Sequence, residues 1–230
     1  MRLVAFGCSL TYGHGLPDCY VEPDYPGRKP SELSWPYVIA SELGIECLNL
    51  SSPGSSNKRI WYNILNFDFQ HDDIVFILWS YPERSCIINR DQITDIGPWI
   101  ENFNSLYDNF YSEYDSEIMT KLFVKNSNDY LNRKNIKVHN LVVSDLFKDI
   151  FTLADDVTPH LNIFIDSLRY KFNVALDNSH PDENCHKELA RLILNKIDIK
   201  HSIPKQKQMS IKEKFKFAYP KLYRLIKHGY

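Results

Sequence analysis

Residues 1–13 read MRLVAFGCSLTYG and contain a short apolar run followed by a bend. The four apolar residues from Leu3 to Phe6 are typical of a strand that is buried on both faces of a sheet. Gly7 then lets the backbone turn sharply, and Ser9 follows where the strand ends. A serine at the carboxyl end of a parallel strand projects into the crevice where such folds bind ligands. Alone, the motif is more typical of a serine that only caps a helix, so a second motif has to support a functional role.

The rest of the chain alternates between strand-like and helix-like segments. Apolar runs with the length of strands cover 45–50, 74–79 and 136–143. Helical spacing of apolar residues covers 35–43, 58–69, roughly 103–131 and 183–197. Strands that alternate with helices predict a parallel sheet covered on both faces. The expected fold class is therefore α/β, a three-layer α/β/α sandwich around a central parallel sheet.

Two segments have expected places around this sheet. The segment 14–34 is rich in proline and glycine, which is the composition of a loop. Loops of this length inside a compact domain are usually functional, so we expect this one to help wall the active site. In 103–131 aromatic residues recur mostly at three- and four-residue steps. This spacing predicts one or two amphipathic helices that pack on the sheet.

Composition excludes several classes of protein. The chain has 230 residues, of which 43% are hydrophobic and 24% charged, so it is not collagen-like, wholly disordered or a disulfide scaffold. The longest apolar run, 74–79, is far too short to span a membrane. The first apolar run is too short for a secretory signal, and the five cysteines are scattered and form no Cys-x-x-Cys pair. We therefore expect a cytoplasmic protein with reduced thiols and no structural zinc site.

The last thirty residues differ from the body in charge. From 200 to 230 there are nine Lys or Arg and one acid, Glu213, which gives this tail a charge of +8 although the whole chain carries −2. We expect a catalytic domain at 1–198 and a basic amphipathic tail at 199–230, in which Pro220 interrupts the helical pattern. Such a tail can dock on the acidic body, mediate self-association or contact an anionic membrane surface. No nucleic-acid module accompanies the charge, so nucleic acid is not expected as a partner.

The second motif that carries chemistry, DNSHP at 177–181, lies just before the last predicted helix. A nucleophilic serine needs a base to take its proton, and the base needs a carboxylate on its other ring nitrogen. Asp177 and His180, three residues apart on one tight loop, can supply both. We therefore expect His180 to face Ser9 and Asp177 to orient His180.

Together, GCSLTYG at 7–13 and DNSHP at 177–181 resemble the SGNH hydrolases, also called the GDSL esterase and lipase family. The resemblance implies a flavodoxin-like sheet and ester hydrolysis through an acyl-serine intermediate, without a cofactor or a metal. By position, Ser9 would be the nucleophile, Asp177 the orienting acid and His180 the general base. The aromatic and polar loop 14–34 suits a carbohydrate ester better than a long-chain lipid, so we expect a small-molecule or glycan ester with a short acyl group, such as acetyl. A sugar hydroxyl could also accept the acyl group in place of water.

The oxyanion hole is matched only in part. Gly54 matches the glycine of the family's second block, so the backbone amides of Ser9 and Gly54 would be two donors to the oxyanion. The third block usually supplies an asparagine after the third strand, but 78–84 reads LWSYPER. Candidate replacements are Asn57, Ser80 and Arg84, and residue type favours Asn57. Ser80 and Arg84 could instead bind the substrate, with Arg84 holding an acidic group of it. Arg84 could also form a salt bridge with Glu83 or with an acid of a loop.

Three alternatives stay open from the residues. Cys8 could be the nucleophile, although the alternation of side chains at the end of the strand predicts a buried thiol. Asp177, His180 and His186 could form a metal trio, but no further motif supplies a matching ligand, and His186 is expected to pack near the start of the last helix. Because the third-block asparagine is missing, the chain could also be a binding module that kept the fold and lost catalysis.

Overall fold

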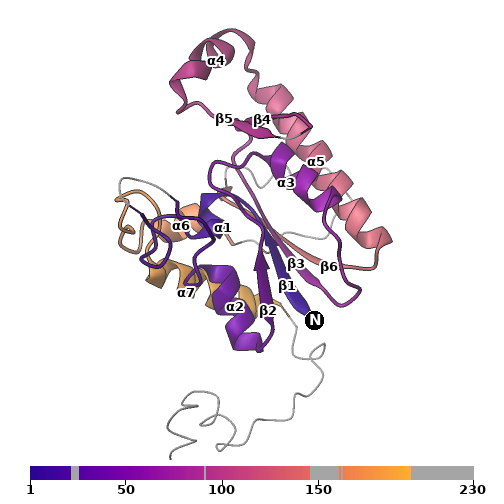
Figure 1. The fold of residues 1–230 in the computed structure, drawn as a ribbon, viewed down its shortest axis with the longest axis vertical. Helices are drawn as coiled ribbons and strands as arrows, with labels where there is room; N and C mark the ends of the chain where they lie inside the picture. The colour runs from indigo at the N-terminus through magenta and orange to yellow at the C-terminus, as the bar shows by residue number, and fades with distance from the viewer. Residues whose placement is uncertain (22–25, 91, 146–160, 162, 198–230) are drawn as a thin grey trace, which may run out of the picture. The chain divides into compact units, whose positions relative to one another are not determined.

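The computed structural model describes residues 1–21, 26–90, 92–145, 161 and 163–197. In this part of the chain, parallel strands form a central sheet in the order β2-β1-β3-β6 (Figure 1). The strands are β1 (Arg2–Phe6), β2 (Glu46–Asn49), β3 (Ile74–Trp79) and β6 (Lys137–Val142). All four lie within the predicted runs or one residue beyond them.

Helices cover both faces of this sheet, as Figure 1 shows. On one face α2 (Trp35–Leu43) packs on β1, β2 and α7 (Glu183–Lys196). On the other face α3 (Asn57–Leu65) packs on β1 and on α5 (Glu113–Arg133). The predicted α/β/α architecture with a central parallel sheet is therefore confirmed.

The side chains of β3 explain why the sheet needs both layers. All six of its residues are buried, which is typical of a parallel strand with both faces covered. Because successive side chains point to opposite faces, Val75, Ile77 and Trp79 enter the apolar cluster formed with α3 and α5. The ring of Phe76 faces the other way and meets Trp35 of α2 edge-on at 6.0 Å.

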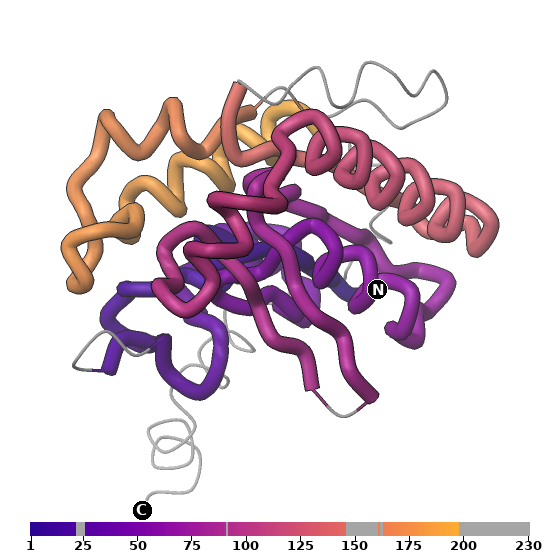
Figure 2. The backbone as a smooth tube through the Cα atoms, turned by 90° about the horizontal axis from the view of Figure 1, so that it is seen from above, coloured from indigo at the N-terminus to yellow at the C-terminus, as the bar shows by residue number. Residues whose placement is uncertain are grey.

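Beyond the carboxyl end of β3 the chain leaves the sheet and forms an antiparallel hairpin. Its strands are β4 (Ser85–Ile88) and β5 (Ile93–Ile96), followed by η1 (Glu101–Phe103) and α4 (Asn104–Phe110) (Figure 2). We did not predict this hairpin. The alternating β-branched residues of 93–96 were its sequence signal.

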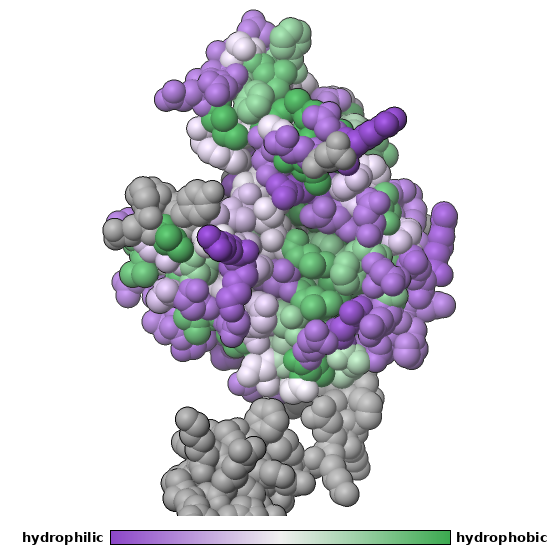
Figure 3. Space-filling model, viewed as in Figure 1, coloured by the Kyte–Doolittle hydropathy of each residue, from purple (hydrophilic) through white to green (hydrophobic). Residues whose placement is uncertain are grey.

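The aromatic segment 103–131 forms two helices, but only part of it packs on the sheet. The buried face of α5 includes Val124 and Leu131. In contrast, Phe110 is 80% exposed and Tyr114 is 74% exposed, and apolar surface gathers over α4 (Figure 3). The predicted packing of these two aromatic residues on the sheet is wrong, because the chain breaks between α4 and α5 and α4 lies beyond the sheet, after the hairpin.

Two histidines are shielded from solvent, His139 in part and His186 fully. Burial lowers the pKa of His139 in β6 to about 4 and that of His186 in α7 to about 3. The Nδ1 atom of His186 accepts the first backbone N–H of α2, from Trp35, at 3.2 Å. His186 therefore satisfies a helix terminus and, as predicted, packs near the start of the last helix.

These two histidines predict a loss of stability in mild acid. Their ordinary pKa is 6.5, so between about pH 6.5 and pH 4 the unfolded chain binds more protons than the folded one. Lowering the pH from 7 to 5 should reduce the free energy of unfolding by about 2 kcal/mol for each histidine. His139→Phe keeps a ring against Phe76, now stacked at 4.9 Å, and should remove one of these two contributions. Urea unfolding at both pH values measures this, with exposed His71→Gln as the control; an unaltered pH dependence in His139→Phe contradicts the prediction.

Met1–Lys196 form one compact unit. The basic tail predicted at 199–230 lies outside the described residues, so its boundary and its partners stay predictions. Among the described residues, no helix combines the length and the apolar character that crossing a membrane requires.

Candidate active site

Ser9 is the first residue of α1 (Ser9–Tyr12), a single helical turn that starts directly after β1. Gly7 makes this abrupt start possible. A Cβ atom on Gly7 would lie 2.1 Å from Thr11 Oγ1, so any side chain there would push α1 away from the strand. The neighbouring Cys8 is fully buried, which agrees with the predicted buried thiol.

The side chain of Asn49 links α1 to the sheet by a hydrogen bond. This residue ends β2, and its Nδ2 donates to the carbonyl oxygen of Thr11 at 2.8 Å. Its Oδ1 accepts from the backbone N–H of Ser51 at 3.2 Å. Asn49 is buried, so these bonds are shielded from competing water. The orientation of the turn that carries Ser9 is therefore set by the strand next to β1.

Asp177 and His180 form the predicted pair. Asp177 Oδ2 lies 2.5 Å from His180 Nδ1. Asp177 Oδ1 accepts the backbone N–H groups of His180 at 3.0 Å and of Ser179 at 3.1 Å. Burial opposes ionisation of Asp177, but these hydrogen bonds and the His180 ring outweigh it and lower the pKa of Asp177. The carboxylate is therefore ionised at neutral pH, and the Nε2 atom of His180 is the ring nitrogen left for chemistry.

A backbone hydrogen bond joins the loop that carries Asp177 and His180 to the segment after β1. The two segments lie side by side although about 160 residues separate them in the chain (Figure 2). The backbone N–H of Leu176 donates to the carbonyl oxygen of Gly15 at 3.0 Å. Within the loop, Ala175 N–H donates to His180 O at 2.8 Å. Arg169 Nη2 donates to Ser179 O at 3.0 Å. These bonds hold His180 in place beside the segment that starts with Ser9.

Gly15 offers a test of this contact. It has φ +87°, and a Cβ atom there would lie 2.6 Å from Asp177 Oδ1. Gly15→Ala should therefore displace the Asp177–His180 pair. For a reaction that this pair catalyses, kcat should fall by about tenfold or more, because a small displacement of reacting groups is costly. Gly44→Ala, at φ +66° after α2, should lose comparable stability through backbone strain, about 1–2 kcal/mol, and keep kcat. Kinetics and thermal unfolding of both variants measure this, and equal kcat values would contradict the role of Gly15.

Ser9, Gly54 and His180 line one pocket of about 550 Å³, which we call the Ser9 pocket. The structure thus brings together residues from the two ends of the domain. Trp99, between β5 and η1, and Arg84, between β3 and β4, form other parts of the wall. The pocket is also lined by His14, Tyr81, Asp95 and Arg169.

Gly54 reaches the pocket through a tight turn, 52–55. The backbone N–H of Ser55 donates to Ser52 O at 3.2 Å, and Gly54 has φ +77°, as position i+2 of a type II turn after proline requires. Ser56 then caps α3 by accepting the N–H of Arg59 at 3.2 Å. The predicted turn with a serine cap is therefore present, and it places Gly54 in the wall of the pocket that Ser9 also lines. Ser9, as the first residue of α1, has an amide without an acceptor inside the helix.

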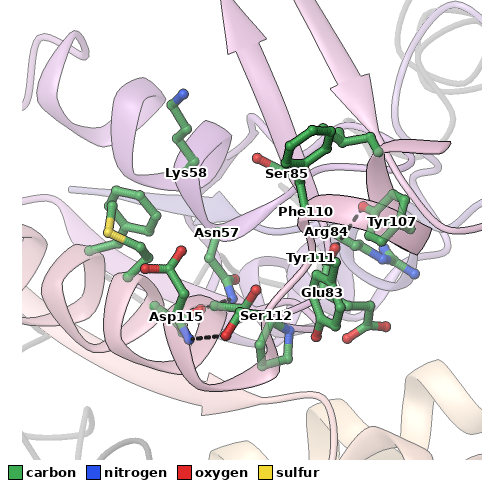
Figure 4. A pocket seen from close by; sticks show the side chains of 16 residues that line it. Asn57, Lys58, Glu83, Arg84, Ser85, Tyr107, Phe110, Tyr111, Ser112 and Asp115 are labelled. Atoms are coloured by element: carbon green, nitrogen blue, oxygen red, sulfur yellow. Dashed lines mark hydrogen bonds between the residues drawn. The ribbon is translucent and has the colours of Figure 1, made fainter. Parts of the chain in front are cut away.

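The structure argues against Asn57 as the third oxyanion donor. Its Nδ2 donates to Ser80 O at 2.9 Å and to Thr120 Oγ1 at 3.2 Å, and its Oδ1 accepts the N–H of Ser80 at 2.7 Å. Asn57 lines a different pocket, of about 340 Å³, between α3, α4 and α5 (Figure 4). We call this second cavity the α4 pocket. The amide of Asn57 therefore binds the backbone of Ser80, directly after β3, and does not line the Ser9 pocket.

Of the three candidate donors, Arg84 alone is among the residues that line the Ser9 pocket. Ser80 is buried, and its Oγ accepts from Arg84 Nη1 at 3.2 Å. The guanidinium of Arg84 lies over the rings of Tyr81 and Trp99, at 4.7 and 4.8 Å from their centroids. The predicted role of Ser80 at the substrate is therefore indirect, through its hydrogen bond to Arg84.

The metal trio considered from the sequence does not assemble, because His186 binds the start of α2. His14, Asp177 and His180 do lie close, with one ligand atom of each within 4.8 Å of the others. The rings of His14 and His180 are stacked at 4.6 Å with 23° between their planes, so their in-plane lone pairs do not converge on one point. The group fits a hydrogen-bonded Asp177–His180 pair with His14 against its face better than a metal site.

Sequence reasoning missed several residues of the wall. His14 begins the proline-rich loop, which was expected at the active site, but no motif singled it out. Trp99 and Arg169 lie in segments without a recognised motif. Tyr81 follows β3, and its hydroxyl donates to Asp166 in α6 (Ile165–Arg169) at 2.9 Å. The position after a strand's carboxyl end was the one signal that could have identified Tyr81.

Comparison with known proteins supports the fold and no more. No family model and no curated protein sequence matches this chain. Among solved structures, TesA matches with a TM-score of 0.58 and 11% identity over 86% of this chain and 98% of that one. The acetyl xylan esterase Est2A from the rumen bacterium Butyrivibrio proteoclasticus gives 0.58 and 11%, over 87% of this chain and 64% of that one. The lipase Lip_vut3 from a goat rumen metagenome gives 0.51 and 12%, over 85% and 97%.

At sequence identities of 11–12%, the similarity to these structures is a similarity of the backbone fold. It extends over most of the domain that carries Ser9, Asp177 and His180. The chain therefore has the fold of the SGNH, or GDSL, esterases and lipases, as its two terminal motifs predicted.

Proposed function

We propose that this protein is a serine ester hydrolase. The observation that carries the proposal is that Ser9, Gly54 and His180 line one pocket while the carboxylate of Asp177 is bonded to the far ring nitrogen of His180. A nucleophile, a base, an orienting acid and an oxyanion donor are the groups that acyl transfer requires. The fold shared with esterases and lipases supports the same reading.

The reaction follows from this placement. His180 Nε2 takes the proton of Ser9 Oγ as this oxygen attacks the acyl carbon, and the amides of Ser9 and Gly54 bind the negative oxygen that forms. The intermediate collapses by releasing the alcohol, which leaves with the proton from His180. Water then attacks the acyl-Ser9 ester, gives its proton to His180, and the acid departs as Ser9 regains its proton. Asp177 stays ionised and stabilises the imidazolium in both halves.

We propose a short acyl group, such as acetyl, carried by a carbohydrate. The Ser9 pocket, at about 550 Å³, is in the range of small-molecule sites. Solved structures with this fold include an acetyl xylan esterase and a family two carbohydrate esterase from Clostridium thermocellum bound to a cellulose oligosaccharide. Transfer of the acyl group to a sugar hydroxyl would use the same residues.

A binding module without catalysis is the second candidate, because the third-block asparagine is missing and, of its three candidate replacements, only Arg84 lines the Ser9 pocket. A fluorophosphonate probe separates the two, because it reacts only with an activated serine. We expect stoichiometric labelling of Ser9 and hydrolysis of an acetylated sugar or an aryl acetate. Absence of both in the folded protein would leave the binding module as the function.

A further inference from the structure

Arg84 is held in an unusual way at the wall of the Ser9 pocket. It lies between β3 and β4, and its guanidinium is placed between the rings of Tyr81 and Trp99, at 4.7 and 4.8 Å from their centroids. Stacking on two rings restricts the side chain while leaving the edge of the guanidinium for hydrogen bonds. The group is therefore preorganised for a ligand before that ligand arrives.

The ion pairs of the arginines around the pocket differ. Arg59 forms an ion pair with Asp95. Burial raises the pKa of Asp95, and the positive charges of Arg59 and, at longer range, of Arg84 oppose this shift. Arg84 acts in the same way on Asp166 at longer range. Arg169 donates to Ser179 O and lies 3.8 Å from Asp166. Within 4.0 Å of Arg84, by contrast, the described residues offer no carboxylate.

Arg84 also forms few hydrogen bonds to the described residues. Nη1 donates to the hydroxyl of Ser80, and the buried Nε atom has no partner among the described residues. The predicted alternative of a salt bridge with Glu83 is not present in this part of the chain. Because Nε is shut off from solvent, a ligand oxygen would bond the outer edge of the guanidinium at Nη2, which forms no hydrogen bond to the described residues.

Arg84 also lines the α4 pocket, which Figure 4 shows, so one residue is common to the walls of both cavities. A substrate whose ester carbonyl lies at Ser9 can direct the rest of the molecule toward this residue. A guanidinium at that place selects for a negatively charged oxygen group, because its planar fork matches carboxylate and phosphate.

From this geometry we propose that the substrate's alcohol portion carries an anionic group, a carboxylate or a phosphate, and that Arg84 binds it beside the Ser9 pocket. This inference rests on the proposed ester hydrolysis and names its substrate class: an acylated acidic sugar or sugar phosphate. Arg84 acts on binding, and Ser9, His180 and Asp177 perform the chemistry.

The test compares three acetyl esters that differ in charge: acetylated glucose, acetylated glucuronate and acetylated glucose 1-phosphate. The unaltered protein should show kcat/KM at least about tenfold higher for one or both charged esters. The charged ester that is preferred identifies the anion. Equal values for all three esters would overturn the proposal, even if no variant could be purified.

Arg84→Gln should lower the charged-to-neutral ratio of kcat/KM by about 10- to 100-fold. Arg133→Gln, on the exposed end of α5, removes the same charge away from the pocket and should keep the ratio. If Arg84 were instead an oxyanion donor or a purely structural residue, Arg84→Gln would slow all three esters equally. That result, or an unchanged ratio, would contradict anion binding.

The design also separates this inference from the proposed function. Hydrolysis of neutral acetylated glucose that requires Ser9, without a preference for charge, would retain the hydrolase and reject the anion site. If no ester is hydrolysed, calorimetric titration with glucuronate, glucose 1-phosphate and glucose still tests Arg84. Binding of a charged sugar that Arg84→Gln weakens at least tenfold supports the site, and equal binding of all three sugars rejects it.

Discussion

Replacing Ser9 with alanine is expected to lower ester turnover by at least about 10³-fold, because the hydroxyl that attacks the ester is lost. The variant should also lose labelling by a fluorophosphonate. The helical turn that carries Ser9 is held by the hydrogen bond from Asn49 and by the close packing at Gly7. Because the Ser9 hydroxyl takes no part in these contacts, its removal should not disturb the fold. Steady-state kinetics on an aryl acetate, with circular dichroism to verify folding, measures the effect.

The matched control is Ser41→Ala, an exposed serine of α2. This variant should keep both turnover and labelling. Retention of turnover by folded Ser9→Ala would remove Ser9 as the nucleophile. In that case the mechanism built on this residue fails, whatever the resemblance of the fold.

Asp177→Asn is expected to reduce kcat by about 10³- to 10⁴-fold, the effect of the same change in a serine protease triad. The carboxylate accepts from the His180 ring and from two backbone N–H groups. An amide placed there can present an N–H to His180 Nδ1 and so favours the wrong tautomer of the ring. The prediction is a loss in kcat that is far larger than any loss in stability.

Asp182→Asn is the control for this change. Asp182 caps α7, since its Oδ1 accepts the backbone N–H of Cys185 at 2.9 Å. Its replacement should lower the free energy of unfolding by up to about 1 kcal/mol and leave kcat within about twofold. Kinetics and urea unfolding of both variants distinguish catalysis from folding. A similar kcat for the two variants would show that Asp177 only shapes the loop.

The backbone architecture and the three residues of the proposed triad could be predicted because their signals are local. The apolar runs of β1 and β3 are buried on both faces, so composition alone identifies them, while β2 and β6 follow apolar runs that are only partly buried. Ser9 comes directly after a strand, and Asp177 and His180 share one short loop. Strands of a parallel sheet end at the same edge, which is why motifs from opposite ends of the domain meet.

Other features depend on contacts that a local pattern does not contain. Asn57 has the right residue type for an oxyanion donor, yet its amide binds Ser80 and Thr120. His186 resembled a metal ligand by spacing, yet it accepts the N–H of Trp35, 151 residues away. The spacing of Phe110 and Tyr114 predicted a buried face, but the break before α5 leaves both exposed.

By itself, the sequence determined the four strands of the sheet, the main helices that cover it and the chemical types at the two motifs, since these follow from periodicity and from short-range spacing. The tertiary structure decided which side chains share a pocket with Ser9, above all Arg84 between its two aromatic rings and His14 against His180. The physical reason is that the direction and partners of a side chain depend on groups brought near it by folding. Those groups are distant in the chain, and no local pattern records them.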